Sequence, residues 1–218
     1  MPSLSDKLQS DGYVEITETD TAVSTAKLAR QISESIGALV SASPDSLVAS
    51  HTGEKPLNTY GGNFGHGQLP LHTDLAHWYR PPRYVLLRCI SGTPTVATHL
   101  FSRRQLESWV PESLMKRALF SPRRRLDGKL FLLQMIDNEL LRRDQLFLKP
   151  QNAAARIVTE MMHDIAADLP LTSVALERAG QTLLVDNWAV LHGRSAIPLS
   201  EPERKLDRIY LEKFSSGN

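Results

Sequence analysis

Short apolar or alternating runs, each bounded by turn-forming residues, make up most of the chain after residue 80. Residues near the start show the same alternation. Successive side chains on a strand point to opposite faces, so runs of this length and composition predict strands. The predicted strands lie at 12–17, 84–90, 95–101, 130–135, 145–148, 182–185 and 206–214. Residues 41–56 are rich in Ser, Pro and Gly and predict a loop.

Two longer segments repeat their apolar residues at helical spacing. The stripes are Leu28, Ile32, Ile36 and Leu39 in a helix at 22–39, and Ala154, Ile157, Met161 and Ile165 in a helix at 152–169. Shorter helices are predicted at 102–109 and 111–118. Many short strands with a few helices predict a mainly β protein with flanking helices, at about 20–40, 102–118 and 152–169. We expect one domain, residues 1–218, built on an antiparallel double-sheet barrel of the jelly-roll or cupin-like kind.

Composition narrows the class of protein. Of 218 residues, 41% are hydrophobic and 22% charged, and the net charge is +1, which is ordinary for a globular protein. No apolar run approaches the roughly 20 residues that span a membrane, and the polar start lacks a signal-peptide pattern. The single cysteine, Cys89, excludes an internal disulfide and is predicted to be a small buried side chain. We therefore expect a cytoplasmic protein without a membrane partner.

Basic residues gather in the middle of the chain although the net charge is near zero. They are Arg103, Arg104, Lys116, Arg117, Arg123, Arg124, Arg125 and Lys129. Two interpretations stay open: solvated helix faces with a loop, or a lip that attracts an anionic substrate. Aromatic residues are not interleaved with them, which argues against single-stranded nucleic acid as a partner.

Two separate segments contain candidate metal ligands. His72 and Asp74 lie two apart in Leu-His-Thr-Asp, and His192 follows much later in Leu-His-Gly-Arg. On a strand, residues two apart point the same way, so His72 and Asp74 can converge on one point. Two histidines and a carboxylate can occupy one face of an octahedral metal and leave its other positions open, as in non-haem Fe(II) oxygenases. Each piece alone is also typical of a capping pair or a core histidine.

A third segment adds two arginines. Strand alternation puts Arg204, Arg208 and Tyr210 on one face of the predicted strand. A guanidinium cannot lose its proton, so arginines that point into a barrel need anions. A dicarboxylate cosubstrate would satisfy at least one of them through a bidentate contact. Internal salt bridges, for instance with Asp186, are the alternative for each arginine.

Taken in order, these segments resemble a known family. Residues 71–74 are followed by Pro81-Pro82, residues 186–194 run from Asp-Asn to His-Gly-Arg, and Arg204 and Arg208 come after them. This order is similar to the taurine dioxygenase-like family of Fe(II)/2-oxoglutarate-dependent dioxygenases, within the clavaminate synthase-like group. The resemblance implies a double-stranded β-helix fold.

The resemblance also implies a role for each matching residue. His72, Asp74 and His192 would bind Fe(II); Arg204 would clamp the distal carboxylate of 2-oxoglutarate with help from Thr98; and Arg208 would face the substrate or share that clamp. The expected cosubstrates are 2-oxoglutarate and O2, with succinate and CO2 released. Because Asp74 leaves no vacancy for a halide ligand, hydroxylation (or desaturation, cyclisation or demethylation) is expected rather than halogenation.

The primary substrate is expected to be a small, carboxylate-bearing molecule such as an amino acid, because Arg208 and the basic middle of the chain suit an anion. Asn63, Phe64 and Gln68, in a glycine-rich approach to the first motif, are candidate substrate contacts. Turn chemistry is the alternative interpretation for these three residues. A homodimer is a further expectation that no residue pattern specifies.

Two other functional classes stay open. The same trio could hold Zn2+ with an activated water in a non-oxidative hydrolase or isomerase on a cupin-like barrel. The pair Arg204 and Arg208 argues against that class, because a hydrolase or isomerase does not bind 2-oxoglutarate and needs no arginine to clamp it. A catalytically silent binding module is the second alternative, and an intact trio of ligands argues against it.

Overall fold

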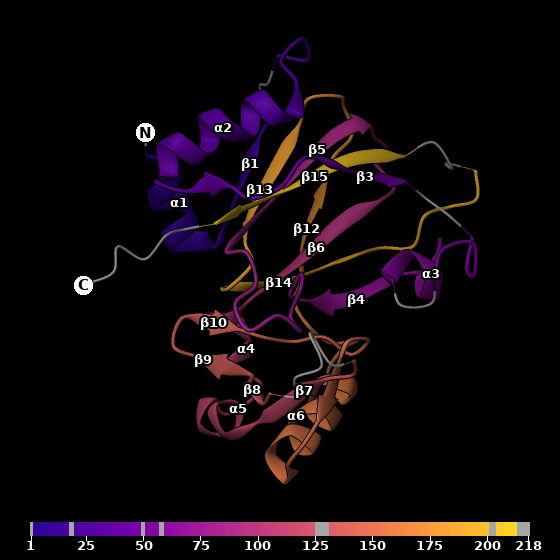
Figure 1. Ribbon diagram of the computed structural model, residues 1–218. Coiled ribbons are helices and arrows are strands. Elements are labelled where there is room, and N and C mark those ends of the chain that lie inside the picture. The colour runs from indigo at the N-terminus through magenta and orange to yellow at the C-terminus, as the bar shows by residue number, and fades with distance from the viewer. Residues whose placement is uncertain are drawn as a thin grey trace.

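The computed structural model describes residues 2–17, 20–48, 51–56, 59–124, 131–200 and 204–212. Over these ranges the chain is mainly β, with antiparallel sheets and a few helices (Figure 1). No helix within them combines the length and the apolar character needed to cross a membrane.

The largest sheet has six strands, with β5 and β15 paired near its centre. In spatial order they are β1 (Tyr13–Ile16), β13 (Thr182–Asp186), β5 (Tyr84–Ser91), β15 (Lys205–Glu212) and β2 (Leu39–Val40), and β3 (Asp45–Val48) also pairs with β15. All of these pairings are antiparallel. The strands predicted at 12–17, 84–90, 182–185 and 206–214 are therefore confirmed, except that residues 213–214 lie outside the described residues.

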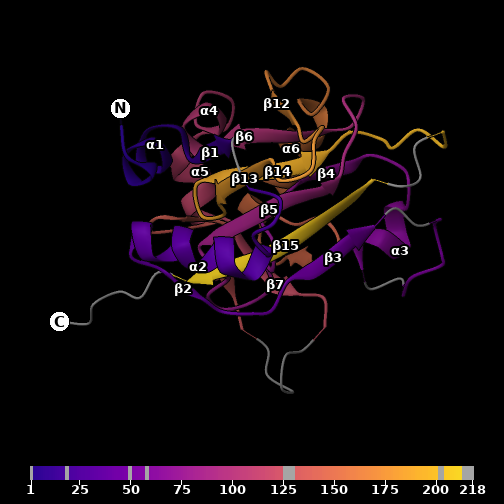
Figure 2. The ribbon, with the colours of Figure 1, turned by 90° about the horizontal axis from the view of Figure 1, so that it is seen from above.

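A second sheet of four strands packs against the first. Its order is β12 (Thr172–Ala175), β6 (Ala97–Ser102), β14 (Val190–Arg194) and β4 (Leu69–His72). One buried cluster contains Val85, Leu183 and Leu206 from the first sheet and Leu100 and Val190 from the second. Figure 2 shows the two layers, with β6 and β14 on one side and β5 and β15 on the other. This antiparallel, two-layer arrangement is consistent with a jelly roll.

Helices α1 (Leu4–Asp11) and α2 (Thr25–Ile36) cover the outer face of the six-stranded sheet (Figure 2). Ile32 of α2 packs in one cluster with Leu86 of β5 and Ile209 of β15. Leu86 points away from the inner cluster because side chains alternate along the strand. α1 was not predicted, since its sequence is mostly polar; its start is fixed by a capping box between Ser3 and Asp6.

Both long helices are shorter than predicted. α2 ends at Ile36 because Gly37 takes a left-handed φ of 64°. Leu39, predicted on the helix stripe, instead lies in β2 and is 57% exposed. Helix α6 (Ala153–Asp164) buries Ala155, Val158 and Met162. Of the predicted stripe, Ala154, Met161 and Ile165 are partly buried against the same core, whereas Ile157 is 46% exposed.

Most of the remaining elements form a layer beside β14 and β4, whereas α3 lies beside the start of β4, outside that layer (Figure 1). The remaining elements are α3 (Tyr60–Phe64), α4 (Arg103–Leu106), α5 (Glu112–Arg117), α6, the sheet of β11 (Leu148–Pro150), β7 (Leu119–Pro122) and β8 (Leu133–Gln134), and the pair β9 (Ile136–Asp137) and β10 (Leu140–Leu141). Apart from α3, their core contains Leu106, Met115 and Val158 together with Leu191 of β14. This layer therefore packs directly against the strand that carries His192.

Several strand predictions need correction in this layer and near β3. Residues 145–147 form a turn rather than the predicted strand, because Asp144 accepts hydrogen bonds from the backbone N–H groups of Leu146 and Phe147. The predicted loop at 41–56 contains β3, and β7 and β12 were not predicted. Of the run at 130–135, only Leu133 and Gln134 form a strand, and residue 130 lies outside the described residues.

Candidate metal centre and its two cavities

The two histidines of the predicted trio face each other across neighbouring strands. His192 of β14 is the direct cross-strand partner of His72 of β4. Side chains of a cross-strand pair lie on the same face of the sheet, and the two ring centroids are 4.6 Å apart. Both residues are buried. The pairing of β4 with β14 therefore brings together two residues that are 120 positions apart in the sequence.

Asp74 reaches the same point by a different route from the one predicted. β4 ends at His72, so the strand-parity argument for Asp74 was wrong. The backbone of Asp74 is instead held by Asn187: its N–H donates to Asn187 Oδ1 at 2.8 Å, and Asn187 Nδ2 donates to its carbonyl at 3.1 Å. Asn187 also donates to the carbonyl of Pro82. The position of Asn187, in the Asp-Asn turn that follows a buried strand, is the sequence feature that could have indicated this role.

A buried arginine holds the turn that follows Asp74. Arg142 donates hydrogen bonds to the backbone carbonyls of Ala76, Trp78 and Tyr79, with distances of 2.6 Å to Trp78 and 3.1 Å to Tyr79. Burial lowers the pKa of Arg142 to about 10. Leu75, directly after Asp74, has a φ of 55°, which is uncommon for a residue other than glycine. The path of the chain on leaving Asp74 is therefore tightly specified.

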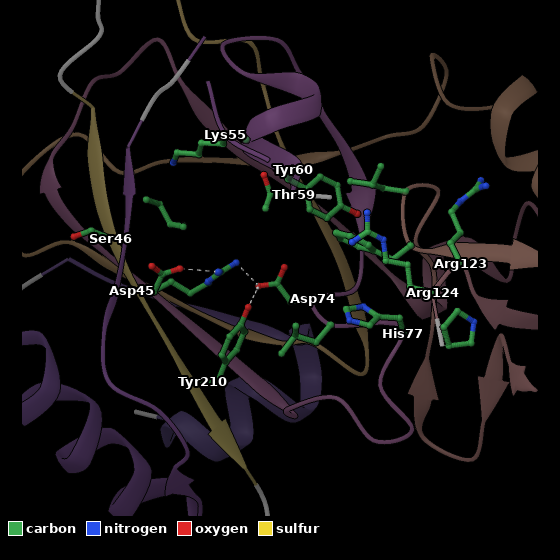
Figure 3. Close-up of a pocket in the computed structure, with 17 residues that line it drawn as sticks. Asp45, Ser46, Lys55, Thr59, Tyr60, Asp74, His77, Arg123, Arg124 and Tyr210 are labelled. Carbon is green, nitrogen blue, oxygen red and sulfur yellow. Dashed lines mark hydrogen bonds and ion pairs between the residues drawn. The ribbon is translucent and has the colours of Figure 1, made fainter. Parts of the chain in front are cut away.

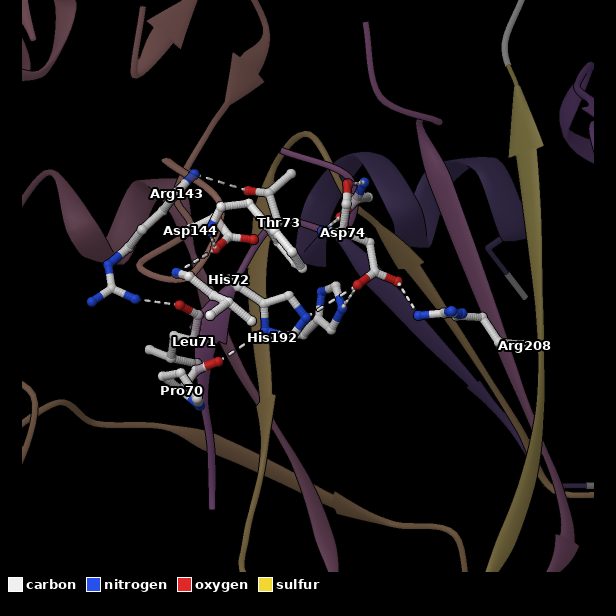
Figure 4. Close-up of polar contacts among 12 residues, drawn as sticks. Pro70, Leu71, His72, Thr73, Asp74, Arg143, Asp144, His192 and Arg208 are labelled. Atoms are coloured by element: carbon white, nitrogen blue, oxygen red, sulfur yellow. Dashed lines mark hydrogen bonds and ion pairs between the residues drawn. The ribbon is translucent and has the colours of Figure 1, made fainter. Parts of the chain in front are cut away.

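The three side chains offer ligand atoms to one point (Figure 4). Asp74 Oδ1 lies 3.1 Å from His72 Nε2 and 3.6 Å from His192 Nε2, and the three candidate ligand atoms lie within 4.8 Å of one another. His72 Nδ1 is bound to the carbonyl of Pro70 at 2.9 Å, so Nε2, which faces Asp74, is the ring nitrogen directed at the centre. Two imidazole nitrogens and one carboxylate oxygen form the donor set that suits Fe(II). The residues therefore fit a metal ion.

The second oxygen of Asp74 has its own partners. Arg208 Nη1 lies 3.2 Å from Asp74 Oδ2, and the Tyr210 hydroxyl donates to the same oxygen at 3.0 Å. On its other side, Arg208 Nη2 pairs with Asp45 Oδ2 at 2.9 Å. The salt-bridge alternative that the sequence left open for Arg208 is thus the arrangement observed, with partners on β3 and in the metal centre. Tyr210 was expected on this face and had no predicted role.

Local charge sets the protonation of the centre. Burial raises the pKa of Asp74, but the charge of Arg208 and hydrogen bonds from the two histidines outweigh it and hold that pKa well below its usual range. Burial lowers the pKa of His72, yet its hydrogen bond to Asp74 and the charge of that carboxylate raise it overall. Burial dominates for His192 and lowers its pKa. Asp74 is therefore a carboxylate, ready to act as a ligand.

A small cavity of about 150 Å³ lies on one side of the centre. Thr98, buried on β6, lines it together with Arg204, which precedes β15 and is also buried. No salt bridge to Arg204 is found among the described residues, and its Nε is buried without a hydrogen-bond partner there. Burial lowers the pKa of this guanidinium. The alternative partner Asp186 is engaged elsewhere, since it pairs with Arg83 at 3.0 Å.

A larger cavity of about 840 Å³ shares Asp74 and Arg208 with the small one (Figure 3). Tyr60 of α3 lines both cavities and stacks on His72, with ring centroids 4.2 Å apart. Asp45 and His77 also line the larger cavity, and His77 is not part of the metal-ligand group.

The basic residues in the middle of the chain divide between two environments. Arg123 and Arg124 line the larger cavity, as the hypothesis of a basic lip requires. Arg103 and Lys116 instead pair with the exposed carboxylate of Glu112, as expected for solvated helix faces. Arg125 and Lys129 lie outside the described residues.

The predicted substrate contacts lie near this cavity without appearing among the residues that line it. Asn63 and Phe64 belong to α3, where the Asn63 amide donates to the carbonyl of Thr59 at 3.0 Å. Gln68 is exposed in the segment between α3 and β4. Tyr60 and Gly61 of the same helix face the cavity instead.

Comparisons with known proteins bear on the fold. No protein-family profile matches the sequence, and neither does any curated protein. An asparagine oxygenase solved with Fe(II), 2S,3S-3-hydroxyasparagine and succinate matches with a TM-score of 0.75 and 17% identity, over 96% of this chain and 78% of that chain. The non-heme iron oxygenase OrfP, solved with Fe, succinate and (3S)-hydroxy-L-Arg, matches with a TM-score of 0.72 and 16% identity, over 94% and 76%.

A third solved structure gives the same result. PvcB from Pseudomonas aeruginosa, described as an Fe, alpha-ketoglutarate dependent oxygenase from an isonitrile synthetic pathway, matches with a TM-score of 0.65 and 17% identity, over 93% of this chain and 76% of that chain. Identities this low show a shared fold. The chain therefore has the fold of these non-heme iron oxygenases.

Proposed function

We propose that this protein is an Fe(II)- and 2-oxoglutarate-dependent dioxygenase that oxidises a C–H bond of a small molecule and releases succinate and CO2. The observation that carries the proposal is the buried group of His72, Asp74 and His192 beside a small cavity that contains Arg204, an arginine with no salt-bridge partner among the described residues. The proposal takes residues 1–218 as one dioxygenase domain and includes the closed double-stranded β-helix that the family resemblance implies.

The donor set supports Fe(II) and leaves room for further ligands. Three protein atoms on one side of an octahedral metal leave its other positions open. When bound, iron with 2-oxoglutarate and O2 supplies the oxidising power for C–H cleavage. The protein binds, orients and excludes water: Tyr60 covers one face of His72, and Asn187 fixes the backbone of Asp74.

The small cavity suits the cosubstrate. Arg204 is a buried cation without an anionic partner among the described residues, and a carboxylate of 2-oxoglutarate would supply that partner through a bidentate contact. Thr98, which lines the same cavity, can donate its hydroxyl to a bound carboxylate. Related folds support this assignment, since OrfP has been solved with alpha-ketoglutaric acid and Fe.

The larger cavity is the proposed substrate site. Arg123 and Arg124 line it, which supports a substrate with an anionic group, and hydroxylation is the proposed outcome because Asp74 occupies the third ligand position. The asparagine oxygenase and OrfP were solved with hydroxylated amino acids, which supports an amino acid or a small-acid derivative here. Asn63, Phe64 and Gln68 remain candidate contacts at the α3 end of the cavity.

Anaerobic titration tests the proposal. Fe(II) and 2-oxoglutarate added together to the metal-free protein should produce a visible charge-transfer band, and air with a panel of amino acids should then yield succinate. Asp74→Ala should show no charge-transfer band and should form about 100-fold less succinate than the wild type. Without a band and without succinate from the wild-type protein, the proposal is wrong, and hydrolysis with Zn2+ becomes the reaction to assay. Full activity of iron-loaded Asp74→Ala would contradict the ligand assignment.

A further inference from the structure

The carboxylate of Asp74 is divided between two environments. Its Oδ1 faces the Nε2 atoms of the two histidines, whereas Oδ2 is bound by two donors from β15, Arg208 Nη1 at 3.2 Å and the Tyr210 hydroxyl at 3.0 Å (Figures 3 and 4). Arg208 and Tyr210 lie two apart on one strand, so both point to the same face. The donors and the histidines thus lie at opposite ends of one carboxylate.

This division bears on how a metal can be bound. A carboxylate can bind through one oxygen or chelate through both, and chelation takes up an additional coordination position. A bidentate cosubstrate and a further small ligand together need every position that three protein atoms leave open on an octahedral metal. Chelation by Asp74 would remove one of them. An oxygen that already accepts a charged and a neutral hydrogen bond is costly to turn toward the metal.

We propose that Tyr210 and Arg208 are positioning residues that hold Asp74 by Oδ2 and offer only Oδ1 to the metal. This inference rests on the proposed function, since it concerns how the same centre binds its ion. It also reassigns Arg208, which the family resemblance would place at the substrate or at the cosubstrate clamp. Both terminal nitrogens of Arg208 are engaged, one by Asp74 and one by Asp45.

The surroundings of Arg208 fix its position. Asp45 holds the guanidinium from the β3 side, and the same group lies over the ring of Tyr210, 5.0 Å from its centroid. Arg208 Nε is buried with no hydrogen-bond partner among the described residues. The guanidinium therefore bridges two carboxylates, Asp74 and Asp45, while its side chain lines both cavities.

The test uses Mn(II) alone as the probe, so that it does not depend on turnover. Tyr210→Phe, Arg208→Gln and the double variant are titrated with Mn(II), and water-proton relaxation reports the number of waters on the bound ion. We expect each single change to weaken Mn(II) binding about tenfold, the usual effect of losing a group that orients a ligand. In the double variant Asp74 is free to chelate, so the bound ion should carry one water fewer than in the wild type.

Controls separate positioning from folding. Tyr79→Phe removes a hydroxyl from a residue that is 75% exposed and outside both cavities, and it should keep the wild-type affinity and water number. Arg208→Gln leaves Asp45 and Asp74 without the guanidinium that pairs with both. If the double variant does not fold, Arg208→Lys combined with Tyr210→Phe replaces it. This variant keeps the positive charge but cannot contact both carboxylates at once, and its bound Mn(II) should also carry one water fewer.

Each outcome decides the question. A water number in the folded double variant equal to that of the wild type overturns the positioning role, whatever happens to the affinity. A wild-type protein that binds neither Mn(II) nor Fe(II) overturns the proposed function, and this inference with it. Loss of one water in the double variant, with none lost in Tyr79→Phe, supports the assignment.

Discussion

Two arginines four residues apart, Arg204 and Arg208, line the same small cavity beside the candidate metal centre but have opposite electrostatic settings. Arg208 lies between Asp74 and Asp45, whereas Arg204 has no carboxylate partner among the described residues. Burial lowers the pKa of both guanidinium groups, but the charge of Asp74 more than restores the pKa of Arg208, while that of Arg204 stays lowered. A buried cation without an internal partner indicates a site for an external anion, and a cation with two internal partners indicates a structural role.

The same contrast separates two buried carboxylates. Asp74 lies against Arg208 and two histidines, and its pKa is held well below the usual range. Asp144, 5% exposed, makes no salt bridge among the described residues. Burial is the largest influence on it and raises its pKa, although the charge of His72 and hydrogen bonds oppose that effect. The charges around a buried carboxyl group, rather than burial alone, therefore decide whether its pKa is lowered, as for Asp74, or raised, as for Asp144.

The strongest test of the contrast is Arg204→Gln. Removing the unpaired cation should weaken 2-oxoglutarate binding to the iron-loaded protein about 30-fold, which corresponds to about 2 kcal/mol for a lost charge-assisted contact. Metal affinity should stay within about threefold, because Arg204 makes no contact with the ligands. Anaerobic titration of the charge-transfer band with 2-oxoglutarate measures the effect. An unchanged dissociation constant for 2-oxoglutarate would show that the cosubstrate carboxylate binds elsewhere. The dissociation constant of Arg204→Lys should lie between those of the wild type and Arg204→Gln.

A second test compares the carboxylates through pH. The raised pKa of Asp144 means that its contribution to stability is full below the unfolded value of 3.8 and is lost as pH rises through the folded pKa. Asp144→Asn removes this ionisation and can keep the bonds from Leu146 and Phe147 through its amide oxygen. Relative to the wild type, the metal-free variant should therefore gain stability progressively as the pH rises above 3.8. Urea unfolding at several pH values measures this, and a difference that does not change with pH would contradict it.

The smallest expected effect comes from Asp45→Asn. Arg208 keeps Asp74 as its partner in this variant, so the dissociation constants for Mn(II) and 2-oxoglutarate should each change less than about threefold. The net charge of the larger cavity becomes more positive, and small anions should then inhibit turnover more strongly than in the wild type. Inhibition by chloride and acetate checks this point. Loss of metal binding in Asp45→Asn would mean that Arg208 depends on Asp45 to reach Asp74.

The sequence predicts which candidate metal ligands come together better than it predicts how they are positioned. The trio His72, Asp74 and His192 follows from residue type and order, and the structure brings all three together. Strand parity was the wrong reason for Asp74, because β4 stops at His72 and a side chain 113 residues away holds the next turn. Long-range hydrogen bonds of this kind leave no periodic pattern in the sequence.

Partners of charged groups were equally hard to predict. Alternation along β15 correctly placed Arg208 and Tyr210 on one face. Their shared contact with Asp74 depends on the register between β15 and β5 and on where the turn after β4 lies, and neither is encoded locally. β3 was missed because it lies within a segment rich in Ser and Pro, and with it Asp45, the ion-pair partner that Arg208 has and Arg204 lacks among the described residues.

The position of β15 within the sheet has a consequence for folding during synthesis. β15 comes last in chain order among the described elements, yet it pairs with β5 on one side and with β2 and β3 on the other. Until the ribosome has released residues 205–212, β5 presents an open edge and the two N-terminal strands lack a partner. Such edges favour intermolecular pairing. The emergence of β15, rather than metal uptake, is then the step before which a nascent molecule is most exposed to aggregation.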